Sequence, residues 1–435
     1  GGATGCADGS DFFFIVRRGS SNNVLIDFMG GGACWYKELC EQHNNVHSIR
    51  MEVRMLDRVP SATAAMLLNS IPGGGTLDIP TLADSSLFGS QVSIADWTYI
   101  FVPYCTQDIH LGTLSTEYTD AQSGAKLLMH HNGAANVNAV ISWVYGNMPS
   151  PDTFALTGCS AGAAGVVALE AARAGRHYAG VSTKVVGIGD SPSFLLTDEF
   201  VQNGLPNWGI ECVVQDALNI TLSEKADANL IWNIWDIALA QHPNVSFGYY
   251  TATEDTTQQK FWRLMGGMID GTDPVADTAK WKRHMLFRTE RLQRHSNFNS
   301  FVATGTGHCT MSFNEASSKT NFSTWAGSAL MHEFPGGSDC GADCRLSGVV
   351  GCDGIQGSGM VEDHCDSCGG DGQTCGNNTQ TFVCVPTTTT TATSTADIGD
   401  AVAANSTGRT LKSWLIALLM AWALMAQRGL VPITS

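Results

Sequence analysis

The sequence is poor in charge, and poorest in basic side chains. Only 15% of its 435 residues are charged, against about 25% in an average soluble domain. Lys and Arg together number 24 and Asp and Glu 40, so the formal net charge is −16. Because a nucleic-acid-binding protein needs a basic face to displace counterions from phosphates, this balance argues against nucleic acid as a partner. Hydrophobic residues make up 43%, enough for a large core.

The sequence also lacks an initiator methionine and a full-length membrane span. It begins with two glycines, so we expect a fragment in which no signal peptide is visible. The uncharged apolar segment 413–427 would extend about 22 Å as a helix, short of a hydrocarbon core of about 30 Å. We interpret it as a short membrane anchor or as the removable tail of a GPI signal. The small residues at 403–406 favour the GPI alternative.

Cysteine, by contrast, is abundant and unevenly placed. Seven of the 14 cysteines lie in the first 309 residues and seven lie within 340–384, among Gly, Asp and Ser. A segment that cannot bury a core needs disulfides or a metal, and we favour a disulfide-stapled module. A zinc site that includes Cys365 and Cys368 is the alternative.

Five Asn-x-Ser/Thr sequons accompany the cysteines, at Asn219, Asn244, Asn321, Asn377 and Asn405. Together, sequons and cysteines predict N-glycans and passage through a eukaryotic secretory pathway. We therefore expect an extracellular or cell-surface protein that is attached to the membrane through its C-terminal tail.

Composition divides the chain into five predicted segments. They are an α/β domain (1–335), a Cys-rich module (336–385), a Thr-rich linker (386–412), a hydrophobic membrane-anchor segment (413–427) and a C-terminal tail (428–435). The linker has seven Thr within residues 387–395, the composition of an O-glycosylated stalk.

Strand-like and helical patterns alternate through the first 330 residues. Strands are predicted at residues 12–16, 24–28, 97–102, 154–157, 185–188, 247–251 and 301–303, with a hairpin-like turn at 19–23. Helices are predicted at residues 121–131, 137–144 and 161–174. This alternation implies an α/β fold, with a mostly parallel sheet flanked by helices.

Residues 158–162 read Gly-Cys-Ser-Ala-Gly between a predicted strand and a predicted helix. A sharp turn there would strain the backbone of Ser160, and the flanking glycines would remove Cβ atoms that clash. Ser160 would then stand at a helix N-terminus, where backbone N–H groups favour a developing oxyanion. We predict Ser160 as a nucleophile and Ala161 as an oxyanion donor, with a tight turn without chemistry as the alternative.

A second glycine-rich segment follows the predicted strand 24–28. Its three glycines, residues 30–32, match the loop that lends a second N–H to the oxyanion hole of elbow-type hydrolases. We predict Gly31 or Gly32 as that donor. A phosphate-binding loop fits less well because no Gly-Lys-Ser/Thr follows, and a glycine turn without chemistry is the other alternative.

A nucleophilic serine needs a base and an acid that orients the base. Elbow hydrolases place these in the order Ser, Asp, His. His308 lies in a glycine-rich loop after a predicted strand, and His284, His295 and His332 are its competitors. Asp255 and Asp190 each follow a predicted strand, so the residues alone leave the acid open.

Over residues 4–315 the sequence resembles the pectinacetylesterase/Notum family of α/β-hydrolase carboxylesterases. The matching motifs are residues 30–35, 102–112, 130–137, 158–162, 189–191, 254–258 and 307–309. The resemblance implies an α/β-hydrolase-like fold with no cofactor and no metal. Two features depart from the family: Cys159 stands where many relatives carry Thr or another small residue, and the segments after the catalytic unit are additions.

The resemblance also implies roles for residues of this sequence. Ser160 would be the nucleophile, His308 the base and Asp255 the acid, since Gln258 follows Asp255 as a Gln follows the family's acid. Gly31, Gly32 and Ala161 would form the oxyanion hole. Trp35, Tyr104 and Asp190 would line the substrate site.

These inferences predict a serine carboxylesterase that acts through an acyl-enzyme. Its expected substrates are O-acyl esters, first of all O-acetyl esters of a glycan. Two alternatives remain: a deacylase of lipidated proteins, and a catalytically silent cell-surface binding protein on an esterase scaffold.

Overall fold

A computed structural model describes residues 4–41, 94–120, 122–192, 195–220, 228–267, 274–309, 319–331, 337–338, 341–362 and 367–370. All of these belong to one compact unit, Gly1–Thr391. The predicted linker, anchor segment and C-terminal tail lie outside the described residues. Within the described residues, no helix combines the length and the apolar character that crossing a membrane requires.

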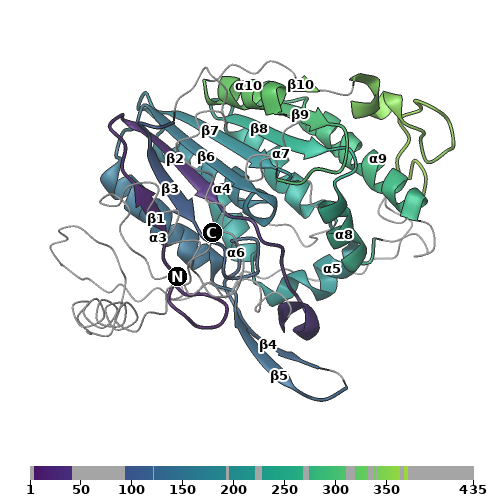
Figure 1. The fold of residues 1–435 in the computed structure, drawn as a ribbon, viewed down its shortest axis with the longest axis horizontal. Helices are drawn as coiled ribbons and strands as arrows, with labels where there is room; N and C mark the ends of the chain where they lie inside the picture. Colours follow the sequence, from purple (N-terminus) through teal and green to yellow (C-terminus); the bar gives the residue numbers. More distant parts are fainter. Residues whose placement is uncertain are drawn as a thin grey trace, which may run out of the picture. The chain divides into compact units, whose positions relative to one another are not determined.

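The centre of the molecule is an eight-stranded sheet with the order β1-β3-β2-β6-β7-β8-β9-β10 (Figure 1). Only the edge strand β1 is antiparallel to its neighbour, and every other neighbouring pair is parallel. The strands are β1 (Ile15–Arg17), β2 (Asn23–Phe28), β3 (Thr98–Val102), β6 (Thr153–Cys159), β7 (Lys184–Asp190), β8 (Ser246–Ala252), β9 (Phe298–Ala303) and β10 (Gly337–Ser338). The predicted α/β fold class is confirmed.

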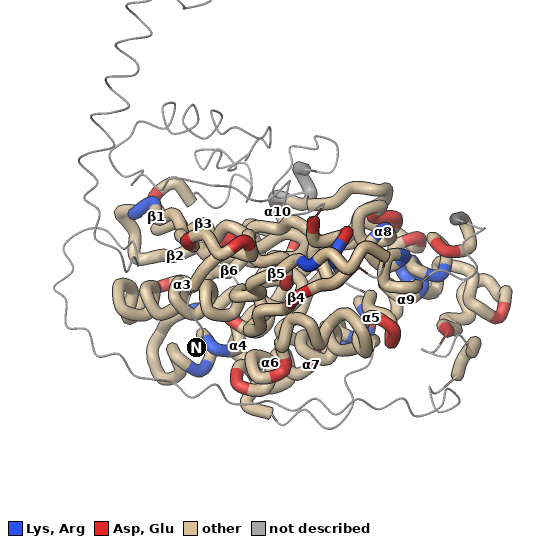
Figure 2. The backbone as a smooth tube through the Cα atoms, turned by 90° about the horizontal axis from the view of Figure 1, so that it is seen from below, with Lys and Arg blue, Asp and Glu red and all other residues tan. Residues whose placement is uncertain are grey.

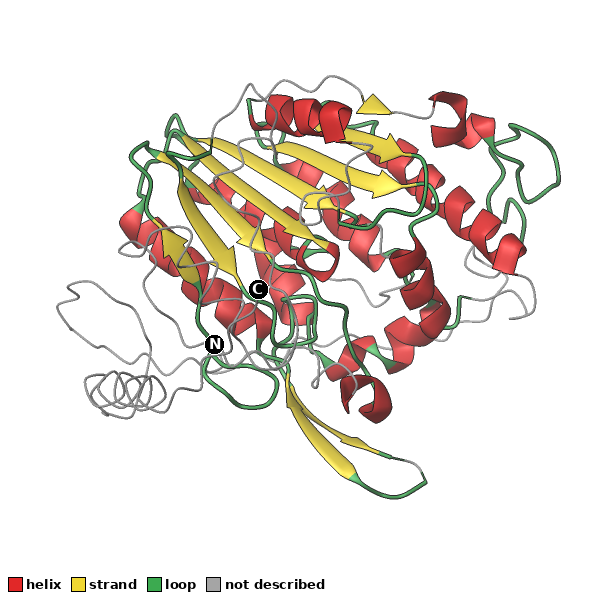
Figure 3. Cartoon of the chain, in the orientation of Figure 1, coloured by secondary structure: helices red, strands yellow, loops and turns green. Residues whose placement is uncertain are grey.

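Helices cover both faces of this sheet. They are α3 (Gly133–Asn147), α4 (Val166–His177), α5 (Asp198–Asn203), α6 (Glu211–Leu218), α7 (Leu230–Gln241), α8 (Thr256–Leu264), α9 (Pro274–Leu292) and α10 (Lys319–Leu330). Figure 2 shows α10 on one side of the strands and α3, α4, α6 and α7 on the other, and Figure 3 shows the same layers by secondary structure.

Alternate residues of each strand pack into the hydrophobic cores on the two faces of the sheet. In β2, Val24 and Ile26 pack with α3, α4 and α7, whereas Leu25 packs with the residues of α10. Successive strand residues point to opposite faces. A strand covered on both sides is therefore hydrophobic throughout, as β3 is with all five residues buried.

The structure corrects two local predictions. The helix predicted at residues 121–131 is wrong: Lys126–His130 form β5, which pairs antiparallel with β4 (Ser115–Thr119) in a hairpin apart from the main sheet. Backbone pairing with β4 overrides the helical propensity of Leu and Met there. The predicted turn at 19–23 does not make a hairpin of β1 and β2, because β3 lies between them.

The described part of the Cys-rich segment packs against α9. Cys344 and Leu346 join Trp281 and Met285 in one buried cluster, and Arg283 forms an ion pair with Glu362. Cys352 and Cys368 form a disulfide, so at Cys368 the disulfide alternative holds over zinc. Cys365 lies outside the described residues, and the predicted boundary at 335/336 stays a prediction.

Disulfides also staple the α/β part of the chain. Cys6 pairs with Cys105 and Cys34 with Cys40, and none of the described cysteines is a free thiol. Such disulfides persist in oxidising compartments, in agreement with an extracellular protein.

Candidate active site

Ser160, Asp255 and His308 all follow strands of the parallel sheet. Ser160 comes directly after β6, Asp255 three residues after β8, and His308 five residues after β9. Because parallel strands end at the same edge of a sheet, the three side chains are brought to one edge. Ligands and catalytic groups of α/β folds gather at this carboxyl edge.

The turn at Ser160 has the strained geometry that its sequence predicts. Ser160 has φ +54°, a left-handed conformation that is uncommon outside glycine. A Cβ on Gly158 would lie 2.1 Å from the carbonyl oxygen of Gly162, and one on Gly162 would lie 2.1 Å from that of Phe28. Both flanking positions therefore require glycine, and the serine is held on a tight turn between β6 and α4.

Asp255 and His308 form a short, directed pair. Nδ1 of His308 lies 2.7 Å from Oδ2 of Asp255. Asp255 is fully buried, and its carboxylate also accepts the backbone N–H of Gln258 at 2.9 Å and the side-chain amide of Gln258 at 2.8 Å. A carboxylate only accepts, so Nδ1 carries a proton, and Nε2 is the nitrogen that the contact with Asp255 leaves unused.

The side chain of His308 remains 15% exposed, while that of Asp255 is completely enclosed. The carboxylate of Asp255 is thus held at the N-cap of α8, and the imidazole of His308 keeps an open side. This arrangement can orient an imidazole and leave its outer nitrogen free to take a proton.

The glycine loop, residues 30–32, lies against the turn at Ser160. A Cβ on Gly30 would lie 2.5 Å from the carbonyl oxygen of Cys159 and 3.1 Å from Cβ of Ser160. Gly32 adopts φ +79°, which also favours glycine. In the described part of the chain, the N–H groups of Gly31, Gly32 and Ala161 have no hydrogen-bond acceptor. Unused backbone donors beside a serine are what an oxyanion hole needs.

Asp190 lies close to the same edge but in a different network. It is fully buried and accepts the hydroxyl of Ser191 at 3.0 Å. The oxygen of Ser191 in turn accepts the N–H of Cys309 at 3.2 Å. Asp190 thus supports the backbone of the His308 loop, whereas Asp255 pairs with the ring itself.

The competing histidines lie elsewhere. His295 precedes β9, at the opposite edge of the sheet, and pairs with Asp236 at 2.8 Å. His284 lies within α9, and its Nε2 is 3.6 Å from Glu362. His332 lies outside the described residues.

Two predicted substrate-lining residues have structural contacts. Tyr104 is 1% exposed, and its hydroxyl accepts the N–H of Ile109 at 2.7 Å. Trp35 is half-buried and packs edge-to-face on Phe200 at 4.8 Å between ring centroids. The substrate-lining role of Trp35, Tyr104 and Asp190 stays a prediction.

The loop after β3 belongs to the motif at residues 102–112, which resembles a family loop near the site, and it holds a buried network around Asp108 whose hydrogen bonds the sequence reasoning missed. Its carboxylate accepts the hydroxyl of Thr106 at 2.6 Å, the N–H of His110 at 3.1 Å and the N–H of Gly133 at 2.8 Å. Nε2–H of His110 donates to the carbonyl oxygen of Met29 at 2.8 Å, directly before the glycine loop. This contact ties the Asp108 network to the predicted oxyanion hole.

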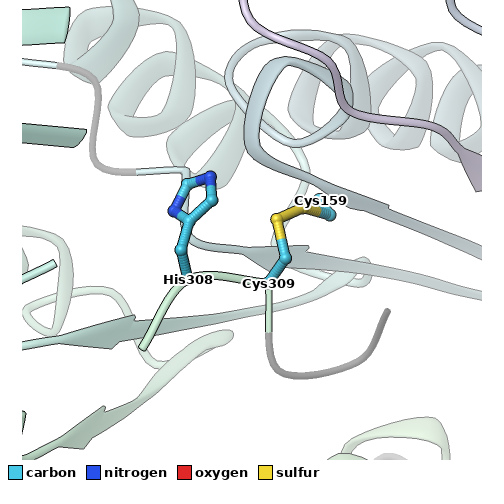
Figure 4. A group of neighbouring side chains, drawn as sticks. All are labelled: Cys159, His308 and Cys309. Atoms are coloured by element: carbon cyan, nitrogen blue, oxygen red, sulfur yellow. A yellow bond between two sulfur atoms is a disulfide. The ribbon is translucent and has the colours of Figure 1, made fainter. Parts of the chain in front are cut away.

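A second missed feature is the disulfide Cys159–Cys309, which lies beside the ring of His308 (Figure 4). A nitrogen of His308 and the two sulfur atoms lie within 4.8 Å of one another. The sulfurs are bonded to each other, so neither is a thiolate that could bind a metal. The signal was present in the sequence, because one cysteine precedes the predicted nucleophile and another follows the predicted base.

No protein-family model and no curated protein matches this sequence. Among solved structures, the chain is similar to the Wnt deacylase Notum from Drosophila, with a TM-score of 0.47 and 16% identity. The match covers 78% of this chain and 96% of that one. At this identity the likeness concerns the fold alone.

Proposed function

We propose that this protein is a serine carboxylesterase that hydrolyses O-acyl esters through an acyl-enzyme, with O-acetyl groups of a glycan as its first substrate class. One observation carries the proposal: a buried carboxylate holds His308 by Nδ1 at 2.7 Å, at the sheet edge where Ser160 stands on a strained turn. Acyl transfer by serine needs this combination of nucleophile, base and orienting acid.

In the first half-reaction, Nε2 of His308 takes the proton of Ser160 as Oγ attacks the ester carbonyl. The carbonyl oxygen becomes an oxyanion, held by the N–H groups of Ala161 and of Gly31 or Gly32. When the ester C–O bond breaks, the proton on His308 passes to the leaving alcohol, and the acyl group stays on Ser160.

In the second half-reaction, His308 takes a proton from water. The resulting hydroxide attacks the acyl-enzyme, the Ser160–acyl bond breaks, and the proton returns to Oγ as the carboxylic acid leaves. Asp255 stabilises the imidazolium in both halves and keeps the imidazole in one tautomer.

The first test is Ser160→Ala with p-nitrophenyl acetate as substrate. We expect kcat to fall by about 10⁴-fold or more, because no other group replaces the attacking oxygen. A fluorophosphonate probe should label the parent and not the variant. Equal rates for both proteins, with neither labelled, would mean a catalytically silent scaffold.

The acyl group is tested with a chain-length series of p-nitrophenyl esters. A maximum of kcat/KM at C2 supports deacetylation of a glycan. A maximum at C8 or longer supports the alternative of a deacylase of lipidated proteins and would replace the substrate class proposed above.

We also propose an extracellular setting for this activity. Asn219 and Asn244 are exposed and stand in two of the five sequons, so N-glycans fit there. Membrane attachment through residues 413–427 is part of the same proposal. Release of the expressed protein from cells by a phospholipase that cleaves GPI anchors would distinguish the two modes of anchoring.

A further inference from the structure

The disulfide Cys159–Cys309 occupies an unusual place in the molecule. It joins the residue before Ser160 to the residue after His308, across 150 residues of sequence. Both cysteines are buried, at 6% and 2% exposure. Among the described disulfides, it is the one that bridges the neighbours of the predicted nucleophile and the predicted base.

The loop that carries His308 has to reach across the sheet. β6 and β9 are not neighbours, because β7 and β8 lie between them. With strands about 4.8 Å apart, the two strand ends are separated by about 14 Å. The disulfide brings the Cα atoms of Cys159 and Cys309 to 5.4 Å from each other.

Hydrogen bonds hold the rest of the loop to residues that follow β8 and β7. The N–H of Glu254, after β8, donates to the carbonyl oxygen of Gly305 at 2.9 Å. The oxygen of Ser191, after β7, accepts the N–H of Cys309. Residues 304–306 are exposed. The disulfide is the covalent contact that links the loop to β6, next to Ser160.

We propose that the Cys159–Cys309 disulfide is a positioning element of the esterase: it ties the loop that carries His308 to the turn that carries Ser160, as proton transfer between the two side chains requires, and full activity requires it to be oxidised. This inference rests on the proposed function. Proton transfer needs a heavy-atom distance of about 2.6–3.2 Å, and a displacement of about 1 Å costs roughly 100-fold in rate. Asp255 fixes the tilt of the imidazole, and the disulfide fixes its approach to Ser160.

A dithiol reductant would break this link. Dithiothreitol transfers two electrons and two protons to the S–S bond, so Cys159 and Cys309 become thiols while the reagent closes to its cyclic disulfide. The His308 loop would then be held to the sheet by hydrogen bonds and the Asp255 pair.

The test compares two disulfide deletions with the parent protein. Cys159→Ala/Cys309→Ala should lower kcat for p-nitrophenyl acetate about 100-fold and leave KM within about twofold, because positioning acts on the chemical step. Cys352→Ala/Cys368→Ala removes a disulfide outside the site and should leave kcat within about twofold. A folded Cys159→Ala/Cys309→Ala protein with the parent's kcat would overturn the inference.

A second measurement covers the case in which the double variant does not fold. The parent is treated with graded dithiothreitol, its open thiols are alkylated, and each opened disulfide is quantified by mass spectrometry. We expect kcat to fall in proportion to opening of Cys159–Cys309. Unchanged kcat with that bond fully open would contradict the proposal.

Ser160→Ala in the same assay separates the two proposals. If kcat of the parent is no higher than that of Ser160→Ala, both the proposed esterase function and this inference are wrong. If kcat of the parent is much higher than that of Ser160→Ala but equal to that of the folded Cys159→Ala/Cys309→Ala variant, only this inference is wrong.

Discussion

Two groups of His and Asp use the same residue types differently. Asp255 and His308 follow β8 and β9 of the main sheet, whereas Asp108 and His110 follow β3, and His131 follows β5 of the separate hairpin. In one, Asp255 contacts the ring of His308 directly, and that ring keeps an open side. In the other, Asp108 contacts the backbone N–H of His110, while His110 and His131 are each 2% exposed or less.

In the second group, both ring nitrogens of His131 form hydrogen bonds with other protein groups. Nδ1–H of His131 donates to the carbonyl oxygen of Thr106 at 2.9 Å, and its Nε2 accepts the hydroxyl of Tyr118 at 2.9 Å. A His with both nitrogens engaged by protein groups has none left for a substrate proton. Access to one nitrogen, rather than the presence of a nearby Asp, separates the candidate base from the architectural histidines.

The largest difference between the two groups should appear with Asp255→Asn. We expect kcat to fall about 10⁴-fold, since the Asn amide can donate to Nδ1 and stabilise the wrong tautomer of His308. The melting temperature should change little because Asn preserves the volume and the cap of α8. The measurement is kcat with p-nitrophenyl acetate alongside thermal unfolding. A variant with more than a tenth of the parent's kcat would remove Asp255 from the triad.

His131→Phe should have the opposite profile. It leaves the carbonyl oxygen of Thr106 and the hydroxyl of Tyr118 without a partner, and we expect a loss of about 3 kcal/mol in the free energy of unfolding. We expect kcat to stay within about threefold of the parent. Urea unfolding and steady-state kinetics check both halves, and a stable variant with a large loss of kcat would contradict the assignment.

His110 belongs to the second group but contacts Met29, directly before the glycine loop, so its substitution should give an intermediate result. His110→Leu removes the donor to Met29 and loosens the glycine loop, which should lower kcat about tenfold, less than the loss of a complete oxyanion donor. His110→Gln keeps an N–H donor and is the matched control. If both variants have the same kcat, the contact with Met29 does not position the loop.

The smallest effect concerns pH. Burial lowers the pKa of His110 and of His131 below the usual value of about 6.5. The unfolded chain therefore binds more protons than the folded one as pH falls below about 6.5, and the stability contributed by these neutral rings is complete above that pH and decreases below it. The urea midpoint of the parent should fall from pH 7.5 to pH 5.5, and that of His131→Phe should fall less.

Asp27 has the opposite effect on stability as pH falls, so Asp27→Asn is the control for this experiment. Burial raises its pKa from about 3.8 to about 6, and Tyr99 donates to its carboxylate at 2.6 Å. The folded state holds this proton more tightly, so its contribution decreases as pH rises from about 3.8 through about 6. The urea midpoint of Asp27→Asn should therefore fall more steeply toward pH 5.5 than that of the parent. An equal slope with and without His131 would contradict the pKa assignment of that ring.

Much of the fold was predictable because its signals are local. The strands around residues 24–28, 154–157 and 247–251 are short runs of mainly hydrophobic residues, as expected for strands that are buried on both faces. One exception was residues 126–130, where Leu and Met favour a helix but the chain pairs with β4 as a strand. A local sequence pattern does not show which distant strand a segment will pair with.

The candidate site divides in the same way. Contacts within the turn and with β2 require glycine on both sides of Ser160. The strained turn could therefore be predicted from the local motif. The choice between Asp255 and Asp190 remained open from the residues, and the resemblance to a family favoured Asp255. In the structure, that carboxylate contacts the ring of His308 and Asp190 contacts Ser191.

The alternation of strands and helices, the glycine-flanked serine and the abundance of cysteine could all be recognised in the sequence, because they depend on neighbouring residues and composition. Three relations required the folded chain: the pairing of cysteines across the sheet, the contact of Asp255 with His308, and the contact of the Asp108 network with Met29, before the glycine loop. Those relations join residues up to 150 positions apart. They arise because parallel strands place their carboxyl ends at one edge, whatever the distance between them along the chain.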